Sequence, residues 1–303
     1  MRRVSSAELA LLVTVVIWSL NFSAVKVGIG EIAPLAFSVV RFTLGAAVTI
    51  AIVRWREGPL HFARRDWPLL VAAAIVGITV NQFTFVNALA ATTAVNVALL
   101  VGTIAVWTSI LAVLAGQERL DLRHWAGVLL GFAGVALIVV GGPSVAGGGL
   151  GGGALVGDLL ALGVAISWAV YSVLIRPLMQ RYSALQLSAF MMTVGTAALV
   201  PLAVPQLLAQ DWSRVTPLGI GSLLYATFFS VVLTNVLYFT AVHRVGAARA
   251  SLYTYLEPFL GVLFAVWLLA ERVTPVQLAG GIVVVGSVVL ARPRQAAIAE
   301  PGV

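Results

Sequence analysis

The sequence predicts an all-α integral membrane protein, with ten transmembrane helices arranged as two inverted repeats of five helices each. Three observations predict this class: the composition, a series of apolar segments of spanning length, and a similarity between the two halves. Of the 303 residues, 61% are hydrophobic and 10% are charged, and the mean hydropathy is +1.05. A soluble domain is about half apolar and about a quarter charged. Water is therefore not the main solvent of this chain.

The apolar segments have the length that a bilayer requires. A helix needs about 20 apolar residues to cross about 30 Å of hydrocarbon, so the chain has room for about ten spans. Prolines, charged stretches and a glycine-rich stretch separate the segments, which predict spans at residues 6–29, 34–54, 67–88, 92–115, 122–141, 154–175, 184–207, 216–241, 246–269 and 273–291. The first apolar run is longer than the core of a secretory signal. We therefore interpret it as a retained span.

The basic residues predict the orientation. The net charge is +7, and fourteen of the 18 Lys and Arg residues fall on one side of a ten-span topology. Only Arg214 and Arg272 fall in loops on the other side. Basic loops remain cytoplasmic, so both termini are predicted in the cytoplasm, the stretch around Gly147 outside, and the protein in the inner (cytoplasmic) membrane. The fourteen are Arg2, Arg3, Arg54, Arg56, Arg64, Arg65, Arg119, Arg123, Arg176, Arg181, Arg244, Arg249, Arg292 and Arg294.

Several kinds of partner are not expected. The chain has no cysteine, which excludes disulfides, thiolate zinc sites and iron–sulfur clusters. Its three histidines form no metal-binding pattern, and the glycine-rich stretch 147–153 lacks the Lys-Ser/Thr pair of a phosphate-binding loop. No basic run with interleaved aromatic residues indicates nucleic acid. The expected partners are the lipid bilayer and a small-molecule substrate, without a metal or cofactor; the sequence leaves the oligomeric state open.

The two halves of the chain resemble each other. A shift of 153 residues aligns Gln117-Glu118-Arg119-Leu120 with Ala270-Glu271-Arg272-Val273, and a shift of 150 aligns Trp18 with Trp168. The predicted units are a five-helix repeat at 1–141, a glycine-rich linker at 142–153 and a second five-helix repeat at 154–303. Because five is odd, the repeats must point in opposite directions. By analogy with other inverted-repeat folds, this arrangement predicts a binding site between the halves near the midplane.

Several short motifs add a family resemblance that covers nearly the whole chain. They are Ile17-Trp18-Ser19-Leu20-Asn21-Phe22-Ser23-Ala24-Val25-Lys26, Val40-Arg41-Phe42, Gly246-Ala247-Ala248-Arg249-Ala250-Ser251-Leu252, Leu256-Glu257-Pro258, Leu269-Ala270-Glu271-Arg272 and Gln277-Leu278-Ala279-Gly280. In order and spacing they resemble the EamA-type branch of the drug/metabolite transporter superfamily. The resemblance implies an exporter of amino acids, other small metabolites or drugs. The family often has a proline in the fourth span at the position matching Pro258, where this chain has Ala105, so a symmetric kink is not predicted.

Glu257 is the one carboxylate predicted at mid-depth. It lies about 11 residues into the ninth span, which is about 16 Å at 1.5 Å per residue. A carboxylate there costs several kcal/mol unless it faces water or a partner. The functional interpretation is a site for a proton or a substrate amine. The structural interpretation is a brace for backbone groups that Pro258 leaves without hydrogen bonds.

Other polar and aromatic residues within the spans are candidates for a cavity lining. Arg41, about 10 Å into the second span, could hold a substrate carboxylate, whereas Lys26 is expected to extend to the interface. Asn81, Gln82 and Phe85 share one face of the third span, as Trp18 and Asn21 do on the first. Each could instead form a hydrogen bond between helices. The predicted substrate-binding set is Trp18, Asn21, Arg41, Asn81, Gln82, Phe85, Trp168, Tyr171, Tyr238, Tyr253 and Glu257.

Together these patterns predict a secondary transporter that exports small metabolites, amino acids or related compounds, by alternating access. A multidrug or cation exporter of the same fold is the alternative. Coupling to protons stays open. An intramembrane enzyme is disfavoured, because a metalloprotease needs a His-Glu-x-x-His pair and an aspartyl enzyme two facing carboxylates, and the spans contain neither.

Overall fold

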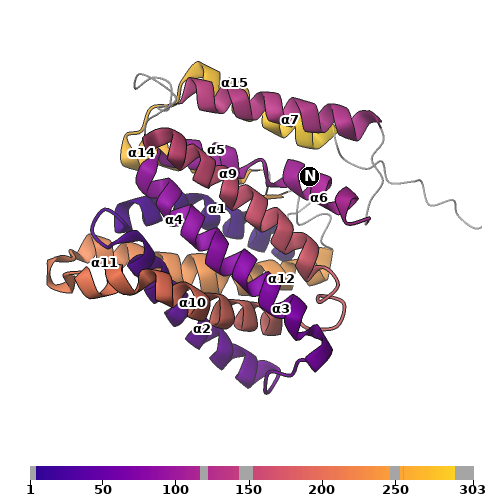
Figure 1. Cartoon of the computed structure of the whole chain (residues 1–303), viewed down its shortest axis with the longest axis vertical. Helices are drawn as coiled ribbons and strands as arrows, with labels where there is room; N and C mark the ends of the chain where they lie inside the picture. The colour runs from indigo at the N-terminus through magenta and orange to yellow at the C-terminus, as the bar shows by residue number, and fades with distance from the viewer. Residues whose placement is uncertain (1–4, 117–121, 143–152, 246–252, 255, 291–303) are drawn as a thin grey trace, which may run out of the picture.

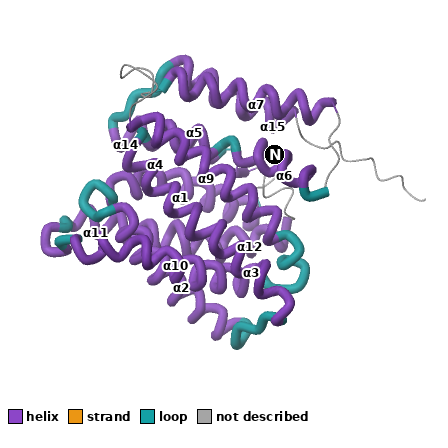
Figure 2. Tube along the Cα trace, viewed as in Figure 1, coloured by secondary structure: helices purple, strands orange, loops and turns teal. Residues whose placement is uncertain are grey.

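The computed structural model describes residues 5–116, 122–142, 153–245, 253–254 and 256–290. These residues are helical throughout apart from short connections, and they contain no strand (Figures 1 and 2). Helical segments occupy all ten predicted spans, so the predicted fold class is confirmed. In order they are α1 (Ser6–Gly28), α2 (Pro34–Arg56), α3 (Trp67–Ala74) and α4 (Asn81–Ala91), α5 (Ala94–Val101) and α6 (Ile104–Leu114), α7 (Leu122–Gly141), α9 (Gly153–Ile175), α10 (Ala184–Ala209), α11 (Pro217–Leu224) and α12 (Thr234–Val245), α14 (Glu257–Leu269) and α15 (Pro275–Leu290).

Local sequence signals begin several of these helices. Ser5 and Glu8 form a reciprocal capping box at the start of α1. Pro34, Pro217 and Pro275 are the first residues of α2, α11 and α15, where a proline loses no intrahelical hydrogen bond. Thr216 caps α11 with its side chain. The predicted breaks at these prolines are therefore confirmed.

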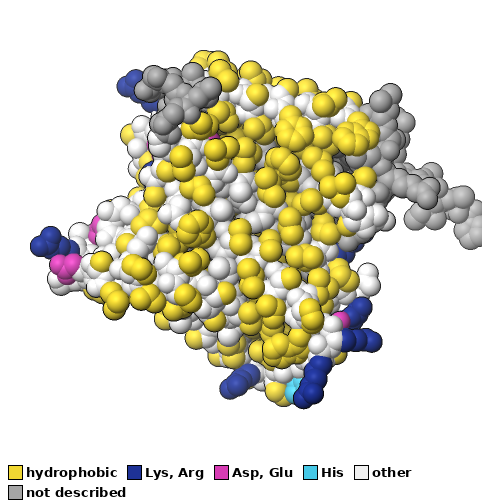
Figure 3. Space-filling view, viewed as in Figure 1, with side chains coloured by type: hydrophobic (Ala, Val, Ile, Leu, Met, Phe, Trp, Pro, Cys, Tyr) yellow, Lys and Arg dark blue, Asp and Glu magenta, His cyan; other side chains and the backbone are white. Residues whose placement is uncertain are grey.

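The apolar surface fits a membrane environment. Within the described residues, seven helices are long and apolar enough to cross a bilayer, and three shorter apolar helices lie at Trp125–Gly141, Glu257–Leu269 and Pro275–Ser287. In Figure 3 hydrophobic side chains cover the middle of the visible face, while charged side chains gather at its left edge and lower right. The chain is a multi-pass membrane protein.

Contacts between the halves follow the internal repeat. The second span packs against the seventh, as α2 against α10, and the fifth against the tenth, as α7 against α15 (Figure 1). The first span, α1, packs against α12 and α14 of the second half, and the sixth span, α9, packs against α4 and α6 of the first. The first span of each half therefore packs against helices of the other half.

Glycines allow α7 and α15 to approach closely. A Cβ atom at Gly134 would lie 2.9 Å from the carbonyl oxygen of Gly280, and one at Gly280 would lie 2.8 Å from the carbonyl oxygen of Gly134. A Cβ at Gly131 would lie 2.7 Å from Val106 Cγ2 on α6. Small residues at such crossings permit backbone contact. The small-residue stripes of the sequence are thus packing surfaces.

The fourth span is interrupted despite Ala105, which corrects the expectation drawn from its missing proline. α5 ends at Val101 and α6 begins at Ile104. The equivalent positions of the second half, 153 residues later, are where α14 begins, at Glu257, with Pro258 in its first turn. The break in the fourth span contacts the first turn of α14, because a Cβ at Gly102 would lie 2.8 Å from Pro258 Cγ. Tertiary packing, and not a local proline, accompanies the break in the fourth span.

The third and eighth spans share a second irregularity. Each contains a π-helical segment, at Ile75–Val80 and at Tyr225–Leu233. The two segments begin 150 residues apart, as the repeat predicts for equivalent positions. A π-helical turn widens the helix and often occurs at functional sites.

Candidate functional site

A cavity of about 690 Å³ lies between the two halves, within the range of small-molecule sites. Lining residues come from the first to fourth spans and from the sixth to tenth. The structure brings together ten of the eleven residues predicted from the sequence: Trp18, Asn21, Arg41, Asn81, Gln82, Phe85, Trp168, Tyr171, Tyr238 and Glu257. Tyr253 lies elsewhere, packed with Tyr238 against Ala7, Leu11 and Ala241.

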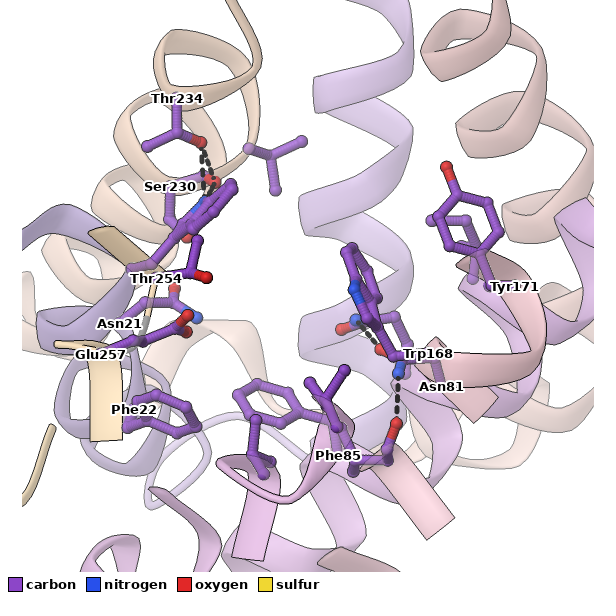
Figure 4. Close-up of a pocket in the computed structure, with 18 of the residues that line it drawn as sticks. Asn21, Phe22, Asn81, Phe85, Trp168, Tyr171, Ser230, Thr234, Thr254 and Glu257 are labelled. Atoms are coloured by element: carbon purple, nitrogen blue, oxygen red, sulfur yellow. Dashed lines mark hydrogen bonds between the residues drawn. The ribbon is translucent and has the colours of Figure 1, made fainter. Parts of the chain in front are cut away.

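The cavity has two walls that correspond to the internal repeat (Figure 4). One wall is built from the first, eighth and ninth spans and carries Asn21, Ser230, Thr234 and Glu257. The other is built from the third and sixth spans and carries Asn81, Trp168 and Tyr171. Phe85 lies between them in this view, and its ring packs edge-on against that of Phe22, with 5.8 Å between the ring centroids.

Trp18 is fixed by the π-helical segment of the eighth span. Its Nε1 donates to the carbonyl oxygen of Ser230 at 3.2 Å and to Thr234 Oγ1 at 2.9 Å. Its ring also contacts that of Tyr238, with 5.4 Å between centroids. Trp18 therefore presents a fixed aromatic surface to the cavity.

Arg41 is bonded to the same π-helical segment. Its Nε donates to the carbonyl oxygen of Ala226 at 3.1 Å and its Nη2 donates to Ser230 Oγ at 3.4 Å. The residue is only 4% exposed, and Nη1 is buried without a hydrogen-bond partner. The guanidinium thus joins the second span to the eighth and presents little surface to the cavity.

Glu257 is the first residue of α14 and contributes to the cavity lining. Its carbonyl oxygen accepts a hydrogen bond from Ser19 Oγ at 3.2 Å, which fixes the backbone against α1. Its side chain is partly exposed, and no described residue donates a hydrogen bond to the carboxylate. A carboxylate in the first turn of a helix interacts favourably with the helix dipole. This carboxylate is therefore open to a partner in the cavity.

On the opposite wall, the side-chain amides donate their hydrogen bonds to other groups of the protein. Asn81 Nδ2 donates to the carbonyl oxygen of Val164 and to Ser167 Oγ, and Gln82 Nε2 donates to Asn81 Oδ1 at 3.1 Å. Gln82 Oε1 has no partner. Tyr171 packs on the backbone of the third span at Gly77, where a Cβ would lie 2.4 Å from Tyr171 Cδ2. This wall is mainly aromatic.

Other lining residues were not predicted from the sequence. Examples are Phe22, Ser188, Met192, Ser230 and Thr234. Ser230 and Thr234 share one face of the eighth span at i,i+4 spacing, a pattern that was available from the sequence. No sequence pattern predicts that Met192 points inward, because an apolar residue in a membrane helix can face lipid or protein equally well.

Side-chain hydrogen bonds gather at the end of the bundle where α1 ends, both within the first half and between the halves. Lys26 Nζ donates to the carbonyl oxygens of Leu89 and Thr92, so it is bonded within the protein rather than only extended to the interface. Glu271 accepts from the backbone nitrogens of Ala94 and Val95 at 2.9 and 2.8 Å, which caps the N-terminus of α5.

A second set of hydrogen bonds lies at the same end. Asp158, which is fully buried, accepts from Asn96 Nδ2 at 2.7 Å, and Asn96 Oδ1 accepts from Gln277 Nε2 at 2.6 Å. The cavity extends away from this end, since it reaches Tyr171 near the end of α9 and Ser188 near the start of α10.

The described lining residues can bind a solute through polar and aromatic contacts. Arg41 and Glu257 are the charged residues among them. The described part of the chain contains no group of three or more His, Asp or Glu side chains placed to hold a metal ion. The site offers aromatic surfaces, amides, hydroxyls and one open carboxylate.

Comparison with known proteins identifies related chains. The EamA-like transporter family pattern matches twice, at residues 5–140 and 155–292. An uncharacterized transporter of Archaeoglobus fulgidus is 30% identical over 291 residues, which span 96% of this chain and 99% of that protein.

Two named relatives are more distant in sequence. A probable terminal-alkyne amino-acid exporter of Streptantibioticus cattleyicolor is 27% identical, over 96% of this chain and 95% of its own. A probable amino-acid metabolite efflux pump of Salmonella typhimurium is 28% identical, over 91% of each. A crystal structure with 22% identity superposes with a TM-score of 0.66 over 95% of this chain and 97% of its own, which is a likeness of fold.

Proposed function

Since the chain belongs to the EamA-like transporter family, we propose that it exports small metabolites, amino acids or related compounds, by alternating access through the cavity between its two repeats. The observation that carries the proposal is the cavity itself, which residues of both repeats line near the break in the fourth span and the start of α14. Interrupted helices at a repeat interface are typical of transporter binding sites. The names of the two amino-acid exporters among the relatives support the substrate class.

We further propose the inner membrane as its location, with both termini in the cytoplasm, a five-helix repeat at 1–141, a linker at 142–153 and a second repeat at 154–303. In that orientation the hydrogen bonds of Lys26, Asp158 and Glu271 close the external end, and the cavity extends towards the cytoplasm. The segment around Gly147 lies outside the described residues.

A multidrug or cation exporter is the second candidate, and the open carboxylate of Glu257 favours it. Because Glu257 is the one acid among the described residues that line this cavity, we assign it to substrate binding and not to a relay of protons between acids. The family matches and the names of the relatives favour a transporter over an intramembrane enzyme.

Counterflow in proteoliposomes tests the proposed function. Vesicles loaded with unlabelled phenylalanine should accumulate external labelled phenylalanine transiently, and the rate should saturate with concentration. Vesicles without protein provide the background. Flux that rises linearly with concentration and shows no transient accumulation would identify a channel and contradict the proposal.

A further inference from the structure

Among the described residues that line the cavity, the charge open to a solute is the negative charge of Glu257. Arg41 and Glu257 are the charged residues of this described lining, and they form no ion pair with each other. Arg41 donates two hydrogen bonds to the eighth span and is 4% exposed. Glu257 is partly exposed, and its carboxylate receives no hydrogen bond from the described residues. A carboxylate away from bulk water is stabilised when a cation or a hydrogen-bond donor contacts it.

The surroundings of Glu257 match a cation of one particular kind. Asn21 lies on the same wall, is 8% exposed, and its Oδ1 has no hydrogen-bond partner (Figure 4). Oxygen acceptors suit an ammonium group, which has three donors and no acceptor. Trp18 and Tyr238 add aromatic surface to this wall, and aromatic faces attract cations. A metal ion is disfavoured, because hard cations require several oxygen ligands and the wall offers one carboxylate.

We propose that Glu257 and Asn21 form an ammonium subsite, and that the solute is recognised by its amine while its carboxylate is dispensable. The inference rests on the proposed transport function and narrows its substrate class. It predicts that primary amines bind as well as the amino acids that contain them. It also predicts that carboxylates without an amine do not bind, because Arg41 donates its hydrogen bonds to the eighth span and is only 4% exposed.

Four phenyl compounds of similar size distinguish recognition of the amine from recognition of the carboxylate. Phenylalanine has both charges, 2-phenylethylamine has the amine alone, 3-phenylpropionate has the carboxylate alone, and N-acetylphenylalanine has a blocked amine. Binding of each to the purified full-length protein is measured by equilibrium dialysis and by the rise in the thermal transition temperature, since a ligand that binds the folded state stabilises it. We expect phenylalanine and 2-phenylethylamine to bind, and the other two to fail.

Variants assign the effect to the subsite. Glu257→Gln keeps the shape of the side chain but removes its charge, and should weaken the affinity for both amines about tenfold or more, as expected for the loss of a charge-assisted contact. Asn21→Ala should weaken it less. Glu57→Gln is the matched control, because Glu57 is exposed and bonded to Ser183 outside the cavity, and it should leave both affinities unchanged.

Three results would overturn the inference: 3-phenylpropionate binding as tightly as phenylalanine, equal affinity of Glu257→Gln and the parent for 2-phenylethylamine, or no binding of either amine. If Glu257→Gln fails to fold, Glu257→Asp keeps the charge and shortens the side chain, and its affinity for both amines should then fall in the same ratio. Unequal loss would reject the subsite. Counterflow distinguishes the two proposals, since exchange of carboxylates alone would preserve the transport function and reject the ammonium subsite.

Discussion

At the scale of single residues, the structure gives the two charged residues of the described cavity lining different roles. Glu257 has an open side chain, whereas Arg41 donates to Ala226 and Ser230. Both residues are visible in the sequence as charges within spans. Only the three-dimensional arrangement shows which of the two already has partners. Arg41 therefore acts mainly as a link between the second and eighth spans.

A substitution at Arg41 tests this link. Arg41→Gln removes two hydrogen bonds from a charged donor, and we expect it to lower the free energy of unfolding by about 1–3 kcal/mol, measured as a fall in the thermal transition temperature in detergent. Arg54→Gln, the same change at an exposed position of α2, should have little effect. Affinities for phenylalanine and 2-phenylethylamine should fall equally in Arg41→Gln. A loss confined to phenylalanine would instead make Arg41 a carboxylate site.

At the scale of helices, the close approach of α7 and α15 depends on glycine at two facing positions. Gly134 and Gly280 each leave room for the other's carbonyl oxygen. Since backbone atoms cannot rotate away as a flexible side chain can, any added methyl group must separate the helices. Membrane helices associate through such packing, because lipid gives no hydrophobic drive for their contact.

Gly134→Ala should therefore destabilise the protein. The new Cβ would lie 2.9 Å from the carbonyl oxygen of Gly280 and 2.7 Å from Val284 Cγ2, and overpacking of this kind costs about 1–3 kcal/mol. Gly286→Ala on α15 is the control, since nothing lies within 4 Å of its added Cβ. It should be neutral or stabilising by up to about 1 kcal/mol, as alanine favours helix. Equal thermal transitions for both variants would show that this crossing is not tightly packed.

At the scale of the whole molecule, the two ends of the helix bundle differ. At one end, Asp158 and Glu271 of the second half accept hydrogen bonds from the first half, and Lys26 donates within the first half. The cavity reaches towards the other end. In inverted-repeat transporters the two repeats exchange conformations during transport. The orientation in the membrane decides which end releases the solute.

Cysteine labelling tests that orientation, because the chain has no native cysteine. Gly147→Cys should react with a membrane-impermeant maleimide in intact cells. His61→Cys, at an exposed position of the loop after α2, should react only after permeabilisation. The reverse pattern would place the termini outside and invert the proposed direction of the cavity.

The sequence by itself determined the spans, the repeats and most of the candidate site. Span length and hydropathy are dictated by bilayer thickness, and polar residues such as Asn21, Asn81 and Glu257 are costly in lipid, so they must face inward. These constraints act on each segment alone, which is why a linear pattern reveals them.

The tertiary structure alone decided how those residues are used. The break at Gly102–Thr103 contacts Pro258, and Arg41 donates to residues 185 and 189 positions away in the chain. The π-helical segment of the third span is bonded to Gly195, 116 residues from Thr79. Tyr253 shows the same dependence, since packing against α1 and not its polarity places it outside the cavity. Whether an apolar or aromatic side chain of a membrane helix points into the bundle is decided by contacts with other helices, because lipid and protein interior are equally apolar.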